Sequence, residues 1–258
     1  MKIRSLLIIC LCLLAPTSAV AEELSQSYAI ENIRYIEVGH AARIEIQQGA
    51  TESLQALGTA DVLERVTVDV KGDRLILGVR RKTGRLFNWF GSDDDIKFVV
   101  QVQELSGLQL RGAAHAAVGA LQGQSLSLDA SGASQIQFER LEYEQLALEL
   151  SGATQAVVND AHLKRLTLSA SGASKVELKG ASTLDELSID LSGASKYFGR
   201  GLDAIQARIK ASGASNADIG VIESLEVRAS GASSVHYAGR PQIKQHTSGA
   251  SNINSRED

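Results

Sequence analysis

Apolar and polar residues alternate in short runs through most of the chain, and the runs return at a nearly constant interval. The stretch "LSASGASKVEL" (168–178) is repeated, with the same small residues and the same alternation, by "IDLSGASKYFG" (189–199). Alternation with a period of two predicts β-strands that bury one face and expose the other. Because none of these runs continues at helical spacing, the pattern predicts an all-β protein.

A Ser-Gly-Ala-Ser motif, or a close variant of it, marks each repeat, and consecutive motif glycines are 18 to 21 residues apart. The apolar positions fall at fixed offsets, such as Ile136 and Phe138 after one motif and Val176 and Leu178 after another. One such unit is too small to bury its own apolar face, so the units must stack. The sequence therefore predicts a parallel β-helix-like solenoid with coils of about 20 residues. Its motif glycines are Gly112, Gly132, Gly152, Gly172, Gly193, Gly213, Gly231 and Gly249.

The motif is expected to form a sharp corner in every coil. Glycine permits the left-handed backbone that such a corner needs, and we expect the alanine to fit inside the crowded bend. The serine hydroxyls can bond backbone groups that the turn leaves unpaired. A third apolar position, occupied by Leu141, Leu202 or Ile222, favours a coil with three faces, although a coil with two faces remains an alternative.

Residues 22–110 show strand patterns without the motif, and we interpret them as an N-terminal β cap region. The runs "ARIEIQ", "ERVTVDV", "DRLILGV" and "DIKFVVQV" are expected to be antiparallel hairpin strands that cover the apolar end of the stack. The repeats then occupy 111–258, so that 22–258 forms one continuous domain. At the far end, Pro241 and the polar tail 252–258 are expected to stop the coil.

The first 21 residues have the pattern of a signal peptide. Lys2 and Arg4 precede an apolar run, and Ala19-Val20-Ala21 fits the cleavage site, so cleavage is expected before Glu22. Both cysteines, Cys10 and Cys12, lie in this segment, and the mature chain therefore has no disulfide. Without Lys2 and Arg4 the formal net charge changes from −4 to −6, which argues against a nucleic-acid partner.

The sequence offers no catalytic, metal or cofactor site. The five histidines show no metal-ligand spacing, and no G-x-S-x-G nucleophile motif is present. His115, directly after a corner motif, is expected to face solvent. Some glycan-cleaving enzymes use β-helices, but Glu139, Glu177 and Asp218 do not recur at one position of the coil. We therefore expect a protein that is not an enzyme, with a carbohydrate-active enzyme as the alternative.

The stretch "GRLFNWFGSDDD" (84–95) is the best candidate for a partner-binding loop. It combines aromatic residues with an acidic run, which could contact a sugar, a partner protein or a lipid headgroup region. The alternative is that its aromatic residues fold over the first coil as part of the cap. The polar outer faces of the strands are a second possible surface for glycans. The candidate loop residues are Leu86, Phe87, Trp89, Phe90, Asp93, Asp94 and Asp95.

The order of these elements resembles the head GIN domain family of autotransporter adhesins. The resemblance rests on "IRYIEVGHAARIEIQQG", "VKGDRLILGV" and "IKFVVQVQELSGLQLRGAA", followed by the serial motif up to "SSVHYAGRPQIKQHTSGASNI". It implies an exported bacterial β-solenoid with no established activity. It therefore favours a non-catalytic, adhesin-like binding module of the cell envelope, with a glycan or an envelope protein as partner.

An accessory role, in which the module binds only another envelope protein, is an alternative. We expect an exported, most simply periplasmic, protein, with the cell surface or secretion as alternatives. No transmembrane segment is expected in the mature chain, because no second apolar run is long enough to span a bilayer.

Overall fold

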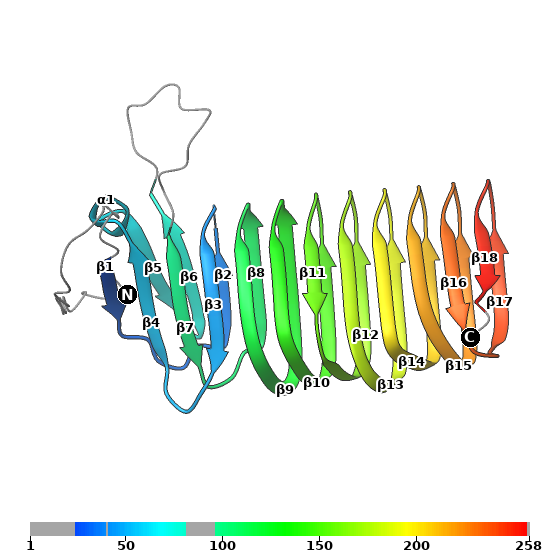
Figure 1. Ribbon diagram of the computed structural model, residues 1–258, viewed down its shortest axis with the longest axis horizontal. Coiled ribbons are helices and arrows are strands. Elements are labelled where there is room, and N and C mark those ends of the chain that lie inside the picture. Colours follow the sequence, from blue (N-terminus) through cyan, green and yellow to red (C-terminus); the bar gives the residue numbers. More distant parts are fainter. Residues whose placement is uncertain (1–23, 40, 81–95, 257–258) are drawn as a thin grey trace, which may run out of the picture.

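The computed structural model describes residues 24–39, 41–80 and 96–256, and these residues form a β-solenoid (Figure 1). One short helix, α1 (Ala60–Leu63), accompanies the strands. The strands are β1 (Leu24–Tyr28), β2 (Tyr35–Val38), β3 (Arg43–Gln48), β4 (Ser53–Gly58), β5 (Val66–Lys71), β6 (Arg74–Val79), β7 (Lys97–Val102), β8 (Gly107–Gly112), β9 (His115–Gly132), β10 (Gln135–Leu150), β11 (Gln155–Val158), β12 (Ala161–Ala170), β13 (Lys175–Leu191), β14 (Lys196–Ala211), β15 (Asn216–Ala229), β16 (Ser234–Ala238), β17 (Gln242–Thr247) and β18 (Asn252–Ser255).

Each coil bends twice between its corner motifs and so has three faces. In β10 the stretches that pair with β9 are 135–138, 140–143 and 145–150. At each break, at 139–140 and at 144–145, two consecutive residues are exposed, whereas elsewhere exposed and buried residues alternate. We call the equivalents of these stretches in every coil the first face, the short second face and the third face.

The inward side chains of the three faces form one continuous apolar core. Leu141, at the predicted third apolar position, is completely buried, and Leu202 is 1% exposed. Ile222 does not fit this prediction, because it is 49% exposed and Val221 is buried instead. Val221 pairs with the inward Ala204 of the preceding coil. The coil that contains Ile222 is one of the shorter ones, and this shifts the inward position by one residue.

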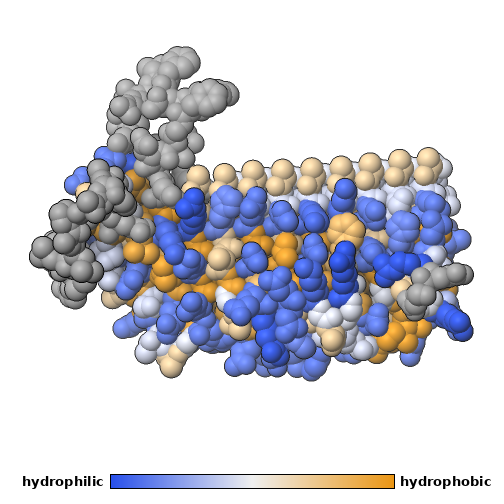
Figure 2. Space-filling model, viewed as in Figure 1, coloured by the Kyte–Doolittle hydropathy of each residue, from blue (hydrophilic) through white to orange (hydrophobic). Residues whose placement is uncertain are grey.

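The corner glycines all have a left-handed backbone, with φ between 71° and 88°. In the six motifs that end at Ser134 to Ser233, the last residue is buried and donates its hydroxyl to the carbonyl of the first, as Ser174 does to Ser171 at 2.8 Å. The serines therefore bond the turn as predicted. In contrast, the prediction that the alanine lies inside the bend is wrong, because alanines such as Ala173 are exposed. Figure 2 shows a row of apolar side chains along this edge of the molecule.

The N-terminal region combines antiparallel and parallel pairing. The predicted hairpin of β5 and β6 is present, and β4 pairs antiparallel with β1 and β7. However, β3, which was expected to be a hairpin strand, pairs in parallel with β7 and β9. Likewise, β2 pairs in parallel with β6 and β8. Strands β2 and β3 thus belong to the stack, while β1, β4, β5 and α1 lie toward its N-terminal end (Figure 1).

At the C-terminal end of the described stack, the last coil has polar inward residues in place of a covering cap. Strand β17 continues the stack past Pro241, in register with β15, so the proline does not end the coil as expected. Two of its three inward positions are Gln245 and Thr247, where the previous coil has Val227 and Ala229, whereas the third, Ile243, replaces Leu225. All six residues of β17 are exposed. Among the described residues, no helix is long and apolar enough to cross a membrane.

Candidate functional site

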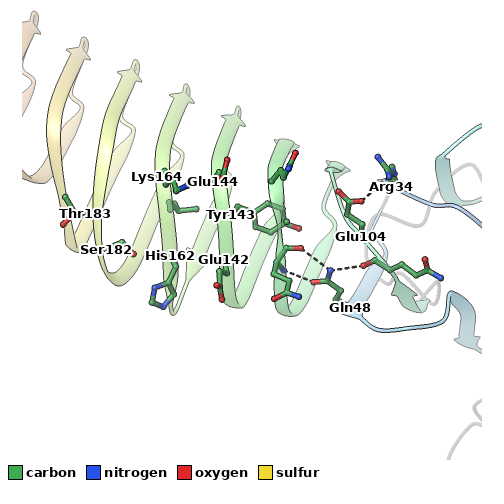
Figure 3. Close-up of a pocket in the computed structure, with 15 residues that line it drawn as sticks. Arg34, Gln48, Glu104, Glu142, Tyr143, Glu144, His162, Lys164, Ser182 and Thr183 are labelled. Atoms are coloured by element: carbon green, nitrogen blue, oxygen red, sulfur yellow. Dashed lines mark hydrogen bonds and ion pairs between the residues drawn. The ribbon is translucent and has the colours of Figure 1, made fainter.

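A groove of about 980 Å³ follows the second face across several coils. Figure 3 shows its lining residues on successive coils, from Arg34 and Glu104 at the N-terminal side to Ser182 and Thr183 on β13. Most of the lining side chains are amides, carboxylates, hydroxyls or cations. The amides belong to Gln48, Gln103, Gln122 and Gln124.

The regular stacking of coils arranges the groove residues in two rows. The outward residues Gln122, Glu142 and His162 are direct register partners on β9, β10 and β12 and form the first row. The second row contains Gln124, Glu144 and Lys164, each of which directly precedes the third face of its coil. Neighbouring strands are about 4.8 Å apart, so each row presents polar groups at that spacing.

Gln48 fixes the N-terminal end of the groove. Its Nε2 donates to the carbonyl of Gln103 at 2.9 Å and to that of Gln122 at 3.2 Å, while its Oε1 accepts from the Gln122 amide at 2.8 Å. Arg34 and Glu104 form an ion pair at 3.3 Å beside it. The amide side chain of Gln48 therefore joins β3 to the first complete coil and has a structural role.

The floor of the groove is the ring of Tyr143, which lies beneath Gly123 of the preceding coil. A Cβ on Gly123 would be 2.6 Å from Tyr143 Cε1, so the close approach requires glycine here. The Tyr143 hydroxyl donates to the Leu105 carbonyl at 2.8 Å. Burial, reinforced by the charge of Glu104, raises the pKa of Tyr143, and the phenol is therefore neutral.

Ion pairs connect neighbouring coils at the open side of the groove. Glu144 and Lys164 are 2.7 Å apart, and their hydrogen bond lowers the pKa of Glu144 and raises the pKa of Lys164. Arg140 lies 3.7 Å from Asp160 of the next coil, and His162 Nε2, in the same coil as Asp160, lies 2.9 Å from that carboxylate. Most of these groups are about half exposed, so they remain available to a ligand.

This arrangement is suited to binding a polyhydroxylated molecule. Amides and carboxylates in rows can donate to and accept from successive hydroxyl groups. Glycoside hydrolysis needs a general acid with a raised pKa, whereas the pKa of Glu144 is lowered. Within 24–39, 41–80 and 96–256, no group of three or more His, Cys, Asp or Glu side chains is arranged to hold a metal ion.

None of the individual residues that the sequence nominated for binding is among the described residues. Leu86, Phe87, Trp89, Phe90, Asp93, Asp94 and Asp95 lie outside the described residues, as do the predicted signal peptide and His40. His115 is exposed on the first face, as predicted. The groove has its own sequence signal, since its rows stand ten and twelve residues after the motif glycines Gly112, Gly132 and Gly152.

The model of one protein family, "Putative auto-transporter adhesin, head GIN domain", matches residues 33–241. The chain belongs to this family. The matched residues include β2 to β16 and every residue that lines the groove, so the groove of this head GIN protein is built on the family's own domain. A comparison with curated proteins finds no match.

Crystal structures of similar proteins share the fold of this head GIN protein. A putative adhesin from Parabacteroides merdae ATCC 43184 has a TM-score of 0.81 at 17% identity, over 92% of this chain and 97% of its own. A putative adhesin from Parabacteroides distasonis ATCC 8503 has a TM-score of 0.81 at 16% identity, over 92% and 98%. A putative lipid binding protein from the same strain has a TM-score of 0.76 at 17% identity, over 91% and 97%. At these identities the similarity shows the solenoid fold.

Proposed function

We propose that this head GIN protein is a non-catalytic, adhesin-like binding module of the bacterial envelope and that the groove on its second face binds a glycan. The observation that supports this proposal is the pair of polar rows, which offers hydrogen-bonding groups at a regular spacing along an open groove. The family description and the similarity to adhesins agree with a binding role. We further propose that the chain is exported, with a periplasmic location as the simplest case.

The polar character of the groove favours a glycan over a lipid tail. Apolar chains bind in pockets with mostly apolar walls, whereas the described walls of this groove consist largely of amides, carboxylates and cations. The buried Tyr143 and Leu163 provide only a narrow apolar floor. We favour a binding role over an enzymatic one because the family description names an adhesin.

Binding of the mature chain (22–258) to a glycan array, followed by calorimetry with the best ligand, tests this proposal. Replacing Gln122 and Gln124 together by Ala should weaken binding about tenfold, because two hydrogen bonds of about 0.5–1.5 kcal/mol each are lost. The matched control replaces Gln135 and Gln155, two exposed amides of the first face, by Ala and should leave the affinity unchanged.

Three results would contradict the proposal. The array could show no saturable binding, the control pair could lose affinity while the groove pair keeps it, or lipid vesicles could bind where glycans do not. The 86–95 loop is tested in the same samples by deleting 86–90. Recovery of one envelope protein by the intact chain, but not by the deletion variant, would support the accessory role instead.

A further inference from the structure

The third face has a systematic distribution of charge along the stack. In the repeat region it comprises eight strand segments, from Gly107–Gly112 in the first coil to Gln242–Thr247 in the eighth. Strands β2 and β6 continue the same sheet toward the N-terminal end. Its outward side chains form three columns, because the coils are in register. In the column nearest the corner motif, the charged residues of the second, third and fifth coils are acidic, and those of the sixth and seventh coils are basic. The members are, in order, Gln109, Asp129, Glu149, Ser169, Asp190, Lys210, Arg228 and His246.

The central column has small residues in the first half of the face. In the central column the second to fifth coils have small residues, which are Ser127, Ala147, Thr167 and Ser188. The following coils have Arg208, Glu226 and Lys244. The outer column has Arg165 in the fourth coil and Glu186 in the fifth, and its other members from the second to the eighth coil are uncharged. A face with small residues allows another surface to approach closely.

Several charges of this face have no partner within their own chain. In the described part of the chain, no ion pair or hydrogen bond involves the carboxylate of Glu149 or the ammonium of Lys210. Glu226, in contrast, is paired with Arg208 at 3.5 Å and with Arg228 at 3.1 Å. Glu149 in the first half and Lys210 in the second half are therefore uncompensated. Asp129, in contrast, accepts a hydrogen bond from Gln109 Nε2 at 2.7 Å.

This distribution is complementary to itself. A two-fold axis that lies between two third faces and runs along the strands reverses the order of the coils but keeps each column opposite the same column of the other copy. When the first coil faces the eighth, Glu149 lies opposite Lys210 and Asp129 lies opposite Arg228 of the second copy. Arg165 then lies opposite Glu186 of the second copy.

The charges select this register over its neighbours. With the first coil opposite the eighth, the central column places Arg208 opposite Ala147 of the second copy, and no column has like charges opposite each other. A shift by one coil in one direction sets Glu149 against Asp190, and a shift in the other direction sets Asp190 against itself. Like charges in contact at an interface cost several kcal/mol, so both shifted registers are disfavoured.

The third face is large enough for such an interface. A strand segment of six residues is about 20 Å long, and eight coils about 4.8 Å apart extend for about 34 Å. The face therefore covers roughly 700 Å², close to the about 800 Å² per partner of a typical specific interface. We propose that two copies of the chain associate through their third faces, with opposite coil order, to form a two-fold symmetric dimer. This proposal does not depend on what the second face binds.

Sedimentation of the mature chain (22–258) tests the dimer directly. It should sediment as a dimer at low ionic strength and shift toward the monomer as salt reduces the screening length from about 10 Å at 0.1 M to about 3 Å at 1 M. Two variants break the charge pattern. The D129K/E149K variant makes both halves of the face basic, and the K210E/R228E variant makes both halves acidic, so each should be monomeric alone.

Mixing the two variants distinguishes loss of the dimer interface from loss of folding. An equimolar mixture should form a heterodimer, because a basic face then meets an acidic one, and the variant with all four substitutions should regain the homodimer. The matched control, K175E/K196E on the first face, should remain dimeric. The proposal is wrong if the unmodified chain is monomeric at low salt, if either charge variant stays dimeric, or if the mixture stays monomeric. Capture of an anionic polymer by the basic half without dimer formation would also overturn it.

Discussion

At the Ser-Gly-Ala-Ser corner, successive coils use nearly the same four residues, whereas along the second face Gln122, Glu142 and His162 follow one another in the same row. Both regions belong to the same stack and have the same spacing between coils. At the corner, each alanine amide from Ala133 to Ala250 donates to the glycine carbonyl of the preceding coil at 2.7 Å. This short contact excludes other backbone conformations at the corner. On the second face the outward side chains meet solvent. Repetition therefore marks the positions that the backbone constrains, and variation marks those that are free to acquire specificity.

The largest expected effect comes from breaking the corner backbone itself. Gly172 has a φ of 77°, and a Cβ there would collide with the Gly152 carbonyl oxygen. Gly172→Ala should lower the free energy of unfolding by about 2–4 kcal/mol, because left-handed strain adds to a shift of the stacked backbone. Urea denaturation measures this change. Ala173→Ser, at the exposed position of the same corner, is the control and should stay within about 0.5 kcal/mol; equal effects of both substitutions would refute the backbone constraint.

A smaller effect is expected from the buried hydroxyl of the same corner. Ser174 is fully buried, and its hydroxyl donates to the Ser171 carbonyl. Ser174→Ala should cost about 1–2 kcal/mol in urea denaturation, since it leaves that carbonyl without this donor. Ser174→Thr should be nearly neutral, because Thr154 makes the equivalent bond at 2.7 Å in another coil. A loss in Ser174→Thr as large as in Ser174→Ala would mean that side-chain volume, and not the hydrogen bond, is limiting.

The smallest effect is expected on the second face, from the exposed pair of Glu144 and Lys164. Because the pKa of Glu144 is lowered in the folded chain, its contribution to stability is present above its unfolded pKa and is lost as the pH falls through its folded pKa. The raised pKa of Lys164 gives a contribution that is lost as the pH rises through its folded pKa.

Melting curves at several pH values and low salt should therefore show a slight acid-side loss that Glu144→Gln abolishes. High salt should abolish it as well, since exposed pairs are screened. The control is Gln145→Glu. It adds a carboxylate next to Glu144, but on the third face instead of the second. An acid-side loss that persists unchanged in Glu144→Gln would assign it to other carboxylates.

The regular parts of this fold could be predicted from the sequence because they depend on local chemistry. Alternating residues such as Ile136 and Phe138 predict the inward side of a strand, and a recurring glycine predicts a left-handed corner. Alternation does not report strand direction, since parallel and antiparallel strands bury their faces in the same way. The parallel pairing of β3 with β7 and β9 depends on contacts between distant segments and was not foreseen.

The polar outer faces were a candidate surface for glycans, but the sequence did not locate the groove on them, for a similar reason. Gln122, Glu142 and His162 differ in chemistry, so a search for one recurring residue type does not detect them. They form a row only because the coils stack in register. The sequence also did not indicate that Gly123 brings the ring of Tyr143 to the floor of a groove. Outward positions of a solenoid therefore have to be compared by their place in the coil.

The polar inward residues Gln245 and Thr247 make the C-terminal end of the stack less stable than the N-terminal end. A solenoid unfolds and folds by removing or adding coils at its ends, because each coil contacts only its neighbours. The last coil buries little apolar surface, so it is the first to open, and amide protection should rise from β17 toward the N-terminal end. During synthesis the N-terminal strands appear first and can serve as the template on which each later coil is laid. We therefore expect the coils to fold in order from the N-terminal end to the C-terminal end and to unfold in the reverse order.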